Sequence, residues 1–171
     1  MNVILEVDPW KSPWTISFQL PDRSERARQP GATAIVCPWG RRGGRLTYAE
    51  LEGRARRIAR GLTRHGIGPG TRTVLMVQPG LDLFALAFGL FMAGAVPVLV
   101  DPGIGLAHLK ACLDRARPEA FIGIGRAHLA RVVLGWARTT IRRPVTVGHR
   151  VLWGGTTLAR VEADGAGGDG L

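Results

Sequence analysis

Glycine-rich turns are where phosphate chemistry can be sought first, because consecutive backbone amides in such turns bind phosphate groups. Gly103-Ile104-Gly105 follows a buried apolar segment and precedes a helical one, as the first part of a dinucleotide-binding loop would. The third glycine of that pattern is replaced here by His108, so we interpret the segment as a tight β–α turn. Gly123-Ile124-Gly125 departs from the pattern in the same way, and the sequence contains no P-loop motif.

Asp101 is the acidic residue with the most suggestive position. It directly follows the apolar strand expected at Val96–Val100, and ligands of parallel sheets bind beyond the carboxyl ends of the strands. Its carboxylate can also cap the turn at Pro102-Gly103, and this is the interpretation we prefer. All three serines lie within residues 1–24, and no G-x-S-x-G nucleophile motif is present.

The histidines do not form a metal-binding pattern. His65, His108, His128 and His149 are scattered, without the short spacings typical of zinc ligands. His65 falls at the expected C-terminus of a helix, where a ring donor or a cation is favourable. We therefore assign no catalytic residue and no metal ligand from the sequence, and cofactor-binding residues stay unknown.

One helix is strongly encoded. Thr47 and Glu50 form a T-x-x-E capping box, in which each side chain satisfies a free backbone N–H at the helix start. Five apolar residues then recur at helical spacing: Leu51, Ala55, Ile58, Ala59 and Leu62. Gly66 supplies the C-terminal stop. These features predict an amphipathic helix over residues 47–65.

Strands and helices alternate after this helix. Apolar segments predict strands at 73–77, 96–100, 120–124, 145–147 and 151–153. The intervening segments predict helices at 81–93, 106–116 and 127–136. Continuously apolar strands that alternate with helices are typical of a parallel sheet covered on both faces. We therefore expect an α/β fold with a partial, doubly wound, mainly parallel sheet.

The two ends of the chain differ from this pattern. Residues 1–22 are rich in proline and predict an irregular leader, followed by a short helix at 24–29. A strand at 32–37 and a basic turn at 40–44 come next. The glycine- and aspartate-rich end predicts a disordered tail over 161–171. We therefore place one incomplete subdomain at 23–160.

The charge is strongly basic without indicating nucleic acid. The formal net charge of +10 comes almost entirely from arginine, since only Lys11 and Lys110 are lysines. The arginines are not interleaved with the aromatic residues on which bases stack. We interpret them as a solvated surface and expect no nucleic-acid partner.

Membrane and secretory features are also not expected. Leu83–Val100 is uncharged over 18 residues, the threshold for a membrane span, but Gly94 and Pro97 interrupt it. A buried helix followed by a buried strand explains it better. Cys37 and Cys112 stand far apart and are interpreted as buried apolar residues. With no signal peptide at the N-terminus, we expect a cytoplasmic protein.

Several segments resemble the AMP-dependent synthetases and ligases, the adenylate-forming enzymes that include acyl-CoA synthetases, luciferases and peptide-synthetase adenylation domains. The segments are LTYAEL at 46–51, GIGPGTR at 66–72, and GAVPV at 94–98 with the following Asp101-Pro102. VLVDPGIG at 98–105 and WGGTTL at 153–158 resemble one branch more specifically. That branch holds the fatty-acid CoA-ligase-like β-lactone synthetases of bacterial olefin biosynthesis. The resemblance covers residues 25–160 and implies the first part of the family's large domain.

The resemblance implies an ATP- and magnesium-dependent reaction. In the family, a carboxylate attacks the α-phosphate of ATP and gives an acyl-adenylate, which then becomes a CoA thioester or, in the olefin branch, a β-lactone. The reaction requires a phosphate loop followed by Pro-Lys, an acidic magnesium ligand and a lysine on a C-terminal domain. Gly154-Gly155-Thr156-Thr157 is not followed by Pro-Lys, and no family catalytic residue maps onto this sequence.

We therefore expect an N-terminal ligase fragment that is inactive alone and holds no cofactor of its own. A non-catalytic interaction module and one half of a split ligase are the alternatives. The candidate partners are the missing C-terminal remainder and a second copy of the chain.

Overall fold

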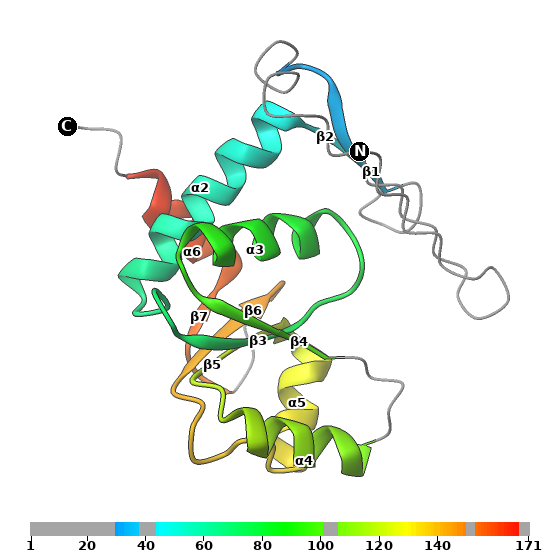
Figure 1. Cartoon of the computed structure of the whole chain (residues 1–171), viewed down its shortest axis with the longest axis vertical. Coiled ribbons are helices and arrows are strands. Elements are labelled where there is room, and N and C mark those ends of the chain that lie inside the picture. The colour runs from blue at the N-terminus through cyan, green and yellow to red at the C-terminus, as the bar shows by residue number, and fades with distance from the viewer. Residues whose placement is uncertain (1–29, 38–43, 101–105, 150–152, 168–171) are drawn as a thin grey trace, which may run out of the picture.

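A five-stranded parallel sheet forms the centre of the molecule (Figure 1). The computed structural model describes residues 30–37, 44–100, 106–149 and 153–167. The strands lie in the order β4-β3-β5-β6-β7, and every neighbouring pair is parallel. Their bounds are β3 (Arg72–Met76), β4 (Val96–Leu99), β5 (Ala120–Ile124), β6 (Arg143–Val147) and β7 (Thr156–Thr157).

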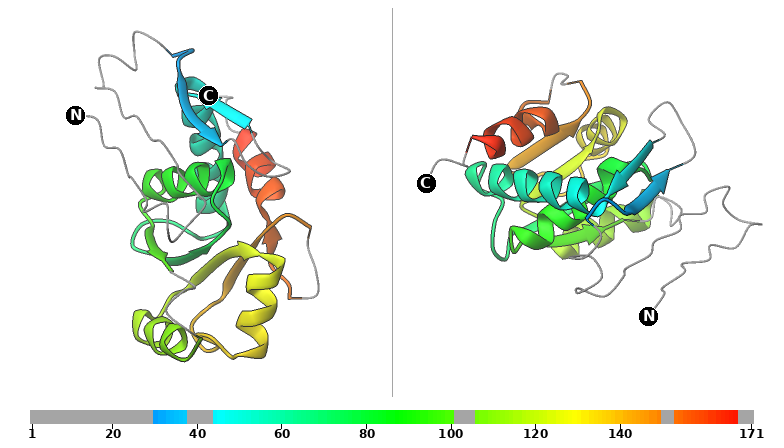
Figure 2. Two further views of the ribbon diagram at one scale, coloured as in Figure 1. Left: turned by 90° about the vertical axis from the view of Figure 1, so that its right-hand side faces the viewer. Right: turned by 90° about the horizontal axis from the view of Figure 1, so that it is seen from above.

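The central strands are apolar on both faces because both faces are covered. In β5, four consecutive residues from Ala120 to Gly123 are buried. Helices α2 (Tyr48–Arg64), α3 (Leu81–Met92) and α6 (Leu158–Ala166) cover one face of the sheet. Helices α4 (Leu106–Ala116) and α5 (Gly125–Val133) cover the other face (Figure 2).

Each face has its own apolar core. The first core packs α2 and α3 on the sheet through residues such as Ile58, Leu86 and Ile122. The second joins Leu109 and Leu113 of α4 to Phe121 of β5. The predicted α/β fold, with a mainly parallel sheet between two helical layers, is confirmed.

Helix α2 begins and ends as its sequence predicts. The Thr47 backbone N–H donates to Glu50 Oε2 at 2.8 Å, and the Glu50 backbone N–H donates to Thr47 Oγ1 at 3.2 Å. This capping box lowers the pKa of Glu50, chiefly through the backbone hydrogen bond from Thr47. His65 forms the C-cap, and Gly66 follows in the left-handed region at φ 76°.

The C-terminal region is ordered where disorder was predicted. Helix α6 occupies Leu158–Ala166, and the Thr157 hydroxyl caps it by accepting the Arg160 backbone N–H at 3.2 Å. Val161 and Gly165 are buried in it. The prediction of a disordered tail over 161–171 is therefore wrong for 161–166, because this segment packs against α2. Residues 168–171 lie outside the described part.

Other differences are local. Gly44 begins a short strand, β2 (Gly44–Thr47), which pairs antiparallel with β1 (Thr33–Cys37). The predicted strand at 151–153 is not seen at Trp153, which lies in a turn, and the last strand forms at β7. The leader 1–22, the helix predicted at 24–29 and most of the basic turn at 40–44 lie outside the described residues.

The long uncharged segment forms a helix and a strand as predicted, but the prediction that the strand is buried is wrong, because β4 (Val96–Leu99) lies at the edge of the sheet. Helix α3 ends at Met92, and Gly94 reverses the chain at φ 71° before β4. In the described part of the chain, no helix has both the length and the apolar character needed to cross a bilayer.

Candidate functional site

The carboxyl edge of the sheet is the candidate functional site. From β3 the chain crosses to β4 on one side, whereas β6 and β7 extend the sheet beyond β5 on the other. The strand order therefore reverses between β3 and β5. In open parallel sheets, ligands bind in the crevice beyond the carboxyl ends of strands at such a reversal.

Two helices begin at this edge without a side-chain cap. Helix α3 follows Gly80, and α5 follows Ile124 at the end of β5. Backbone N–H groups at the start of a helix favour anionic ligand groups. The chain passes from β5 into α5 without a loop, so Gly123-Ile124-Gly125 forms the end of the strand and the first residue of the helix.

A buried histidine of α5 connects this helix to the sheet. His128 is fully buried, and its Nε2 donates to the carbonyl oxygen of Val145 on β6 at 3.0 Å. Its ring stacks on Trp153, with centroids 5.4 Å apart and planes 6° apart, and meets the edge of Phe121 at 4.9 Å. Burial lowers the pKa of His128, so the ring is neutral at pH 7.

Trp153 is the third ring of the cluster with His128 and Phe121, and it lies at the carboxyl edge of the sheet. Its indole N–H donates to the hydroxyl of the buried Thr146 at 3.0 Å. A side chain at Gly125 would contact the Trp153 ring at 3.6 Å, so the ring lies over the first turn of α5. His128 is thus enclosed by protein groups, and its role is to position α5 rather than to contact a substrate.

The other three histidines do not lie together in one site. His65 Nε2 donates to Asp164 Oδ2 at 3.0 Å, which confirms its structural role at the end of α2 and lowers the pKa of Asp164. His108 and His149 are exposed. No group of three His, Cys, Asp or Glu within the described ranges is placed to hold a metal ion.

The remaining residues considered from the sequence have mixed outcomes. Asp101 and the Gly103-Ile104-Gly105 turn lie outside the described residues. Cys37 is partly buried, which raises the pKa of its thiol, but Cys112 is exposed. The prediction that both cysteines are buried is wrong for Cys112, because it lies on the solvent side of α4.

The Gly154-Gly155-Thr156-Thr157 segment has a structural role. Both glycines adopt left-handed backbone angles, with φ of 73° and 79°. A side chain at Gly155 would collide with the carbonyl of Pro144. The two threonines form β7, and Thr157 caps α6. This geometry agrees with the interpretation that the segment is not a phosphate loop.

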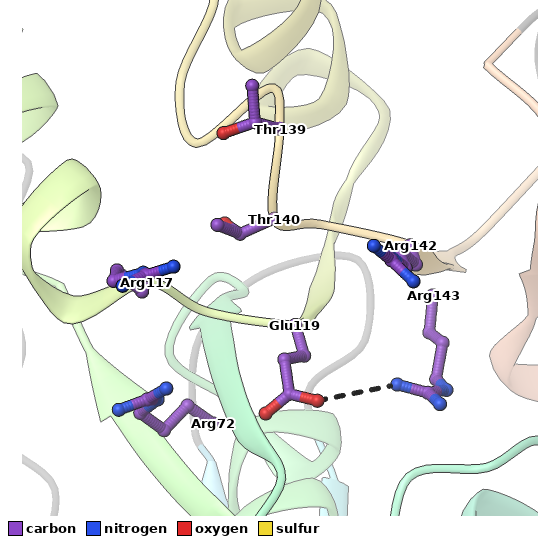
Figure 3. A pocket seen from close by; sticks show the side chains of 7 residues that line it. All are labelled: Arg72, Arg117, Glu119, Thr139, Thr140, Arg142 and Arg143. Atoms are coloured by element: carbon purple, nitrogen blue, oxygen red, sulfur yellow. Dashed lines mark ion pairs between the residues drawn. The ribbon is translucent and has the colours of Figure 1, made fainter.

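A basic hollow that was not predicted from the sequence lies at the opposite, amino edge of the sheet (Figure 3). Its charged lining residues are Arg72, Arg117, Glu119, Arg142 and Arg143. The sequence contained a signal for this hollow, because charged residues stand at or just before the starts of three strands. Amino ends of parallel strands share one edge, but only the strand order shows that β3, β5 and β6 are neighbours.

The chain belongs to the AMP-binding enzyme family, which matches it over residues 23–155. It is 55% identical over 159 residues to an olefin beta-lactone synthetase of Xanthomonas campestris pv. campestris, covering 89% of this chain and 28% of the relative. It is 51% identical over 165 residues to the enzyme of the same name from Stenotrophomonas maltophilia, covering 91% and 29%. The resemblance seen in the sequence is confirmed.

Solved structures of ligases have the same fold. A coronafacic acid ligase from Pectobacterium brasiliense matches with a TM-score of 0.69 at 17% identity, covering 82% of this chain and 28% of that one. A long-chain-fatty-acid-CoA ligase from Archaeoglobus fulgidus matches with a TM-score of 0.68 at 19% identity and the same coverage. The chain therefore spans less than a third of the length of these curated relatives and structures.

Proposed function

We propose that this chain is the front part of an ATP-dependent ligase that activates a fatty or 3-hydroxy acid as an acyl-adenylate. The product of the whole enzyme is then a CoA thioester or a β-lactone. The observation that carries this proposal is the 55% identity, over 89% of the chain, to a protein named olefin beta-lactone synthetase. Membership of the AMP-binding family supports the adenylate step.

The contribution of this chain to such an enzyme is a scaffold. The uncapped starts of α3 and α5 offer backbone amides to an anionic group at the carboxyl edge. The described carboxylates do not converge into a magnesium ligand set, so we derive no step through the metal. We assign the phosphate loop, the magnesium ligand and the charge-neutralising lysine to the length of the relatives that this chain does not span.

A cytoplasmic location is part of the proposal. Cys37 and Cys112 are both free, and Cys112 is exposed to solvent. Exposed free thiols are typical of a reducing compartment.

One half of a split ligase is the second candidate function, with the remainder of the enzyme as partner. It is favoured by exposed apolar side chains on β4 and α5, such as Leu99 at 71% exposure and Val133 at 71%. Apolar surfaces of this kind mark interaction sites. A purely non-catalytic interaction module would use the same surface.

The test is ATP–pyrophosphate exchange with 3-hydroxy fatty acids. We expect no exchange by the chain alone. A chimera of the Xanthomonas relative, with its matched segment replaced by this chain, should restore exchange, and the unmodified relative is the control. A chimera that unfolds as cooperatively as the control but is inactive would overturn the ligase proposal. Exchange by a mixture of the two separate pieces would instead assign a split ligase.

A further inference from the structure

The hollow at the amino edge lies away from the candidate site and has a volume of about 300 Å³. Arg72 stands at the start of β3, Arg117 follows α4, and Arg142 and Arg143 stand at the start of β6. In Figure 3, Arg72 and Arg117 lie on one side of the hollow, and Arg142 and Arg143 lie on the other. Segments far apart in sequence thus bring four guanidinium groups around one space.

The hollow carries unbalanced positive charge. Glu119 is its one acidic lining residue, and it pairs with Arg143 at 3.8 Å. Arg72, Arg117 and Arg142 form no ion pair with any residue that the structure describes. Three guanidinium groups are therefore free to bind an anion.

The rest of the lining is polar. Thr139 and Thr140 form its upper wall in Figure 3, and no aromatic or long aliphatic side chain lines the space. The Thr140 hydroxyl donates to the carbonyl of Ala137 at 3.3 Å. Such a surface fits a small, oxygen-rich anion and does not fit an acyl chain or a nucleotide base.

Arg117 supplies an independent observation. Its φ is 46°, in the left-handed region that glycine normally occupies after a helix. Ala137, which borders the adjoining hollow, has a φ of 44°. These are the two non-glycine residues with positive φ in the described part, and Arg117 lines the hollow itself, whereas Ala137 is buried beside it. Strained backbone of this kind concentrates at binding sites.

We propose that the amino-edge hollow binds a small phosphate-bearing anion, with inorganic diphosphate as its simplest form. The planar guanidinium fork matches pairs of phosphate oxygens, and diphosphate carries enough charge to engage Arg72, Arg117 and Arg142 together. This site is separate from the carboxyl edge, and its occupation does not depend on acyl activation.

The first test is titration of the whole chain with sodium diphosphate by calorimetry, against sodium chloride at equal ionic strength. We expect saturable binding at one site. Arg142→Gln should weaken it at least about tenfold, because hydrogen bonds to charged groups are lost. Arg45→Gln removes the same charge from an exposed position on β2, outside the hollow, and should change the affinity less than about twofold.

Arg117→Gly separates binding from folding. Glycine relieves the strained backbone, so the variant should unfold at the same temperature as the wild type or higher. Its affinity for diphosphate should nevertheless fall at least about tenfold. A lower unfolding temperature with unchanged affinity would show that Arg117 serves the fold and would overturn the proposal.

Two further results would also overturn the proposal. One is an equal loss of affinity in Arg142→Gln and Arg45→Gln, which would mean that the affinity for diphosphate depends only on net charge. The other is displacement of diphosphate by a short DNA duplex at lower concentration than diphosphate itself, which would assign the surface to nucleic acid.

Discussion

His128 is one buried side chain that connects three separate elements near the carboxyl edge of the sheet. It belongs to α5, donates to Val145 on β6 and stacks on Trp153, so a single ring links a helix, a strand and the turn beyond. Burial lowers its pKa, and the nearby Arg131 guanidinium lowers it further, while the carbonyl of Val145 opposes both. The folded state therefore binds a proton at His128 less readily than the unfolded chain does.

The stability of the chain should consequently fall on mild acidification. The unfolded histidine has a pKa of about 6.5, and the folded value lies lower. The stabilisation is complete above the unfolded value and is lost as the pH falls below it. Denaturant unfolding at pH 7.5 and 5.5 should show a larger loss for the wild type than for His128→Phe, which keeps the aromatic stack without a titrating group.

The comparison is internally controlled, because the two proteins share every ionisable group except His128, and the shared contributions cancel in the difference. Equal losses in the wild type and His128→Phe would contradict the assignment of a neutral, buried His128.

The sequence could exclude a metal site at His128 from spacing alone, but it could not find the cluster. Phe121, Val145 and Trp153 lie up to 25 positions from the histidine, and they meet it only because β5 and β6 are neighbours. Composition likewise could not show that Arg117 lines a hollow while other arginines lie on the solvated surface.

At the scale of the elements, α2 is held between α3 and α6 by glycine contacts. A side chain at Gly61 would collide with the carbonyl of Val161 on α6, and one at Gly165 would collide with the carbonyl of Arg57 on α2. On the other side, a side chain at Gly89 would stand 2.5 Å from Ile58 Cγ2. The helices approach this closely because these positions lack side chains.

Gly165→Ala should therefore loosen α6. The added methyl group meets backbone, which cannot move aside, and we expect the free energy of unfolding to fall by about 1–3 kcal/mol. Amide hydrogen exchange in α6 should increase with it. Calorimetric or denaturant unfolding gives the stability, and exchange locates the change.

Gly53→Ala is the matched control on α2. A side chain there meets only the end of the flexible Arg57 side chain, at 3.7 Å. Removing a glycine from a helix interior should then stabilise the chain by about 0.5–1 kcal/mol. If Gly165→Ala behaved like Gly53→Ala, the close packing of α6 on α2 would be refuted.

Helices α2 and α6 differ in how far each could be predicted from the sequence. Helix α2 carries its own signals, namely the capping box at Thr47 and Glu50 and a five-residue apolar stripe. Helix α6 carries glycines and acids that suggest disorder when read as composition. Its order depends on partners elsewhere in the chain, since Glu162 pairs with Arg54 at 2.8 Å and Asp164 with His65. Tertiary packing decided the outcome there, not local propensity.

At the scale of the whole molecule, β4 forms one edge of the sheet and presents apolar side chains. Leu99 is 71% exposed and Val96 46%, and Phe91 at the end of the preceding α3 is 62% exposed. An edge strand with exposed apolar residues is a template for pairing with another chain. In the complete enzyme that we propose, other parts of the ligase cover this region.

The isolated chain should therefore self-associate through β4 at micromolar concentration, which analytical ultracentrifugation measures directly. Leu99→Lys should shift it toward the monomer, because a lysine on an edge strand opposes strand pairing by charge and by desolvation. Ala111→Lys adds the same charge to the exposed face of α4 and should leave the association unchanged. Equal effects of both substitutions would attribute association to net charge, and a monomeric wild type would mean that the β4 edge needs no partner.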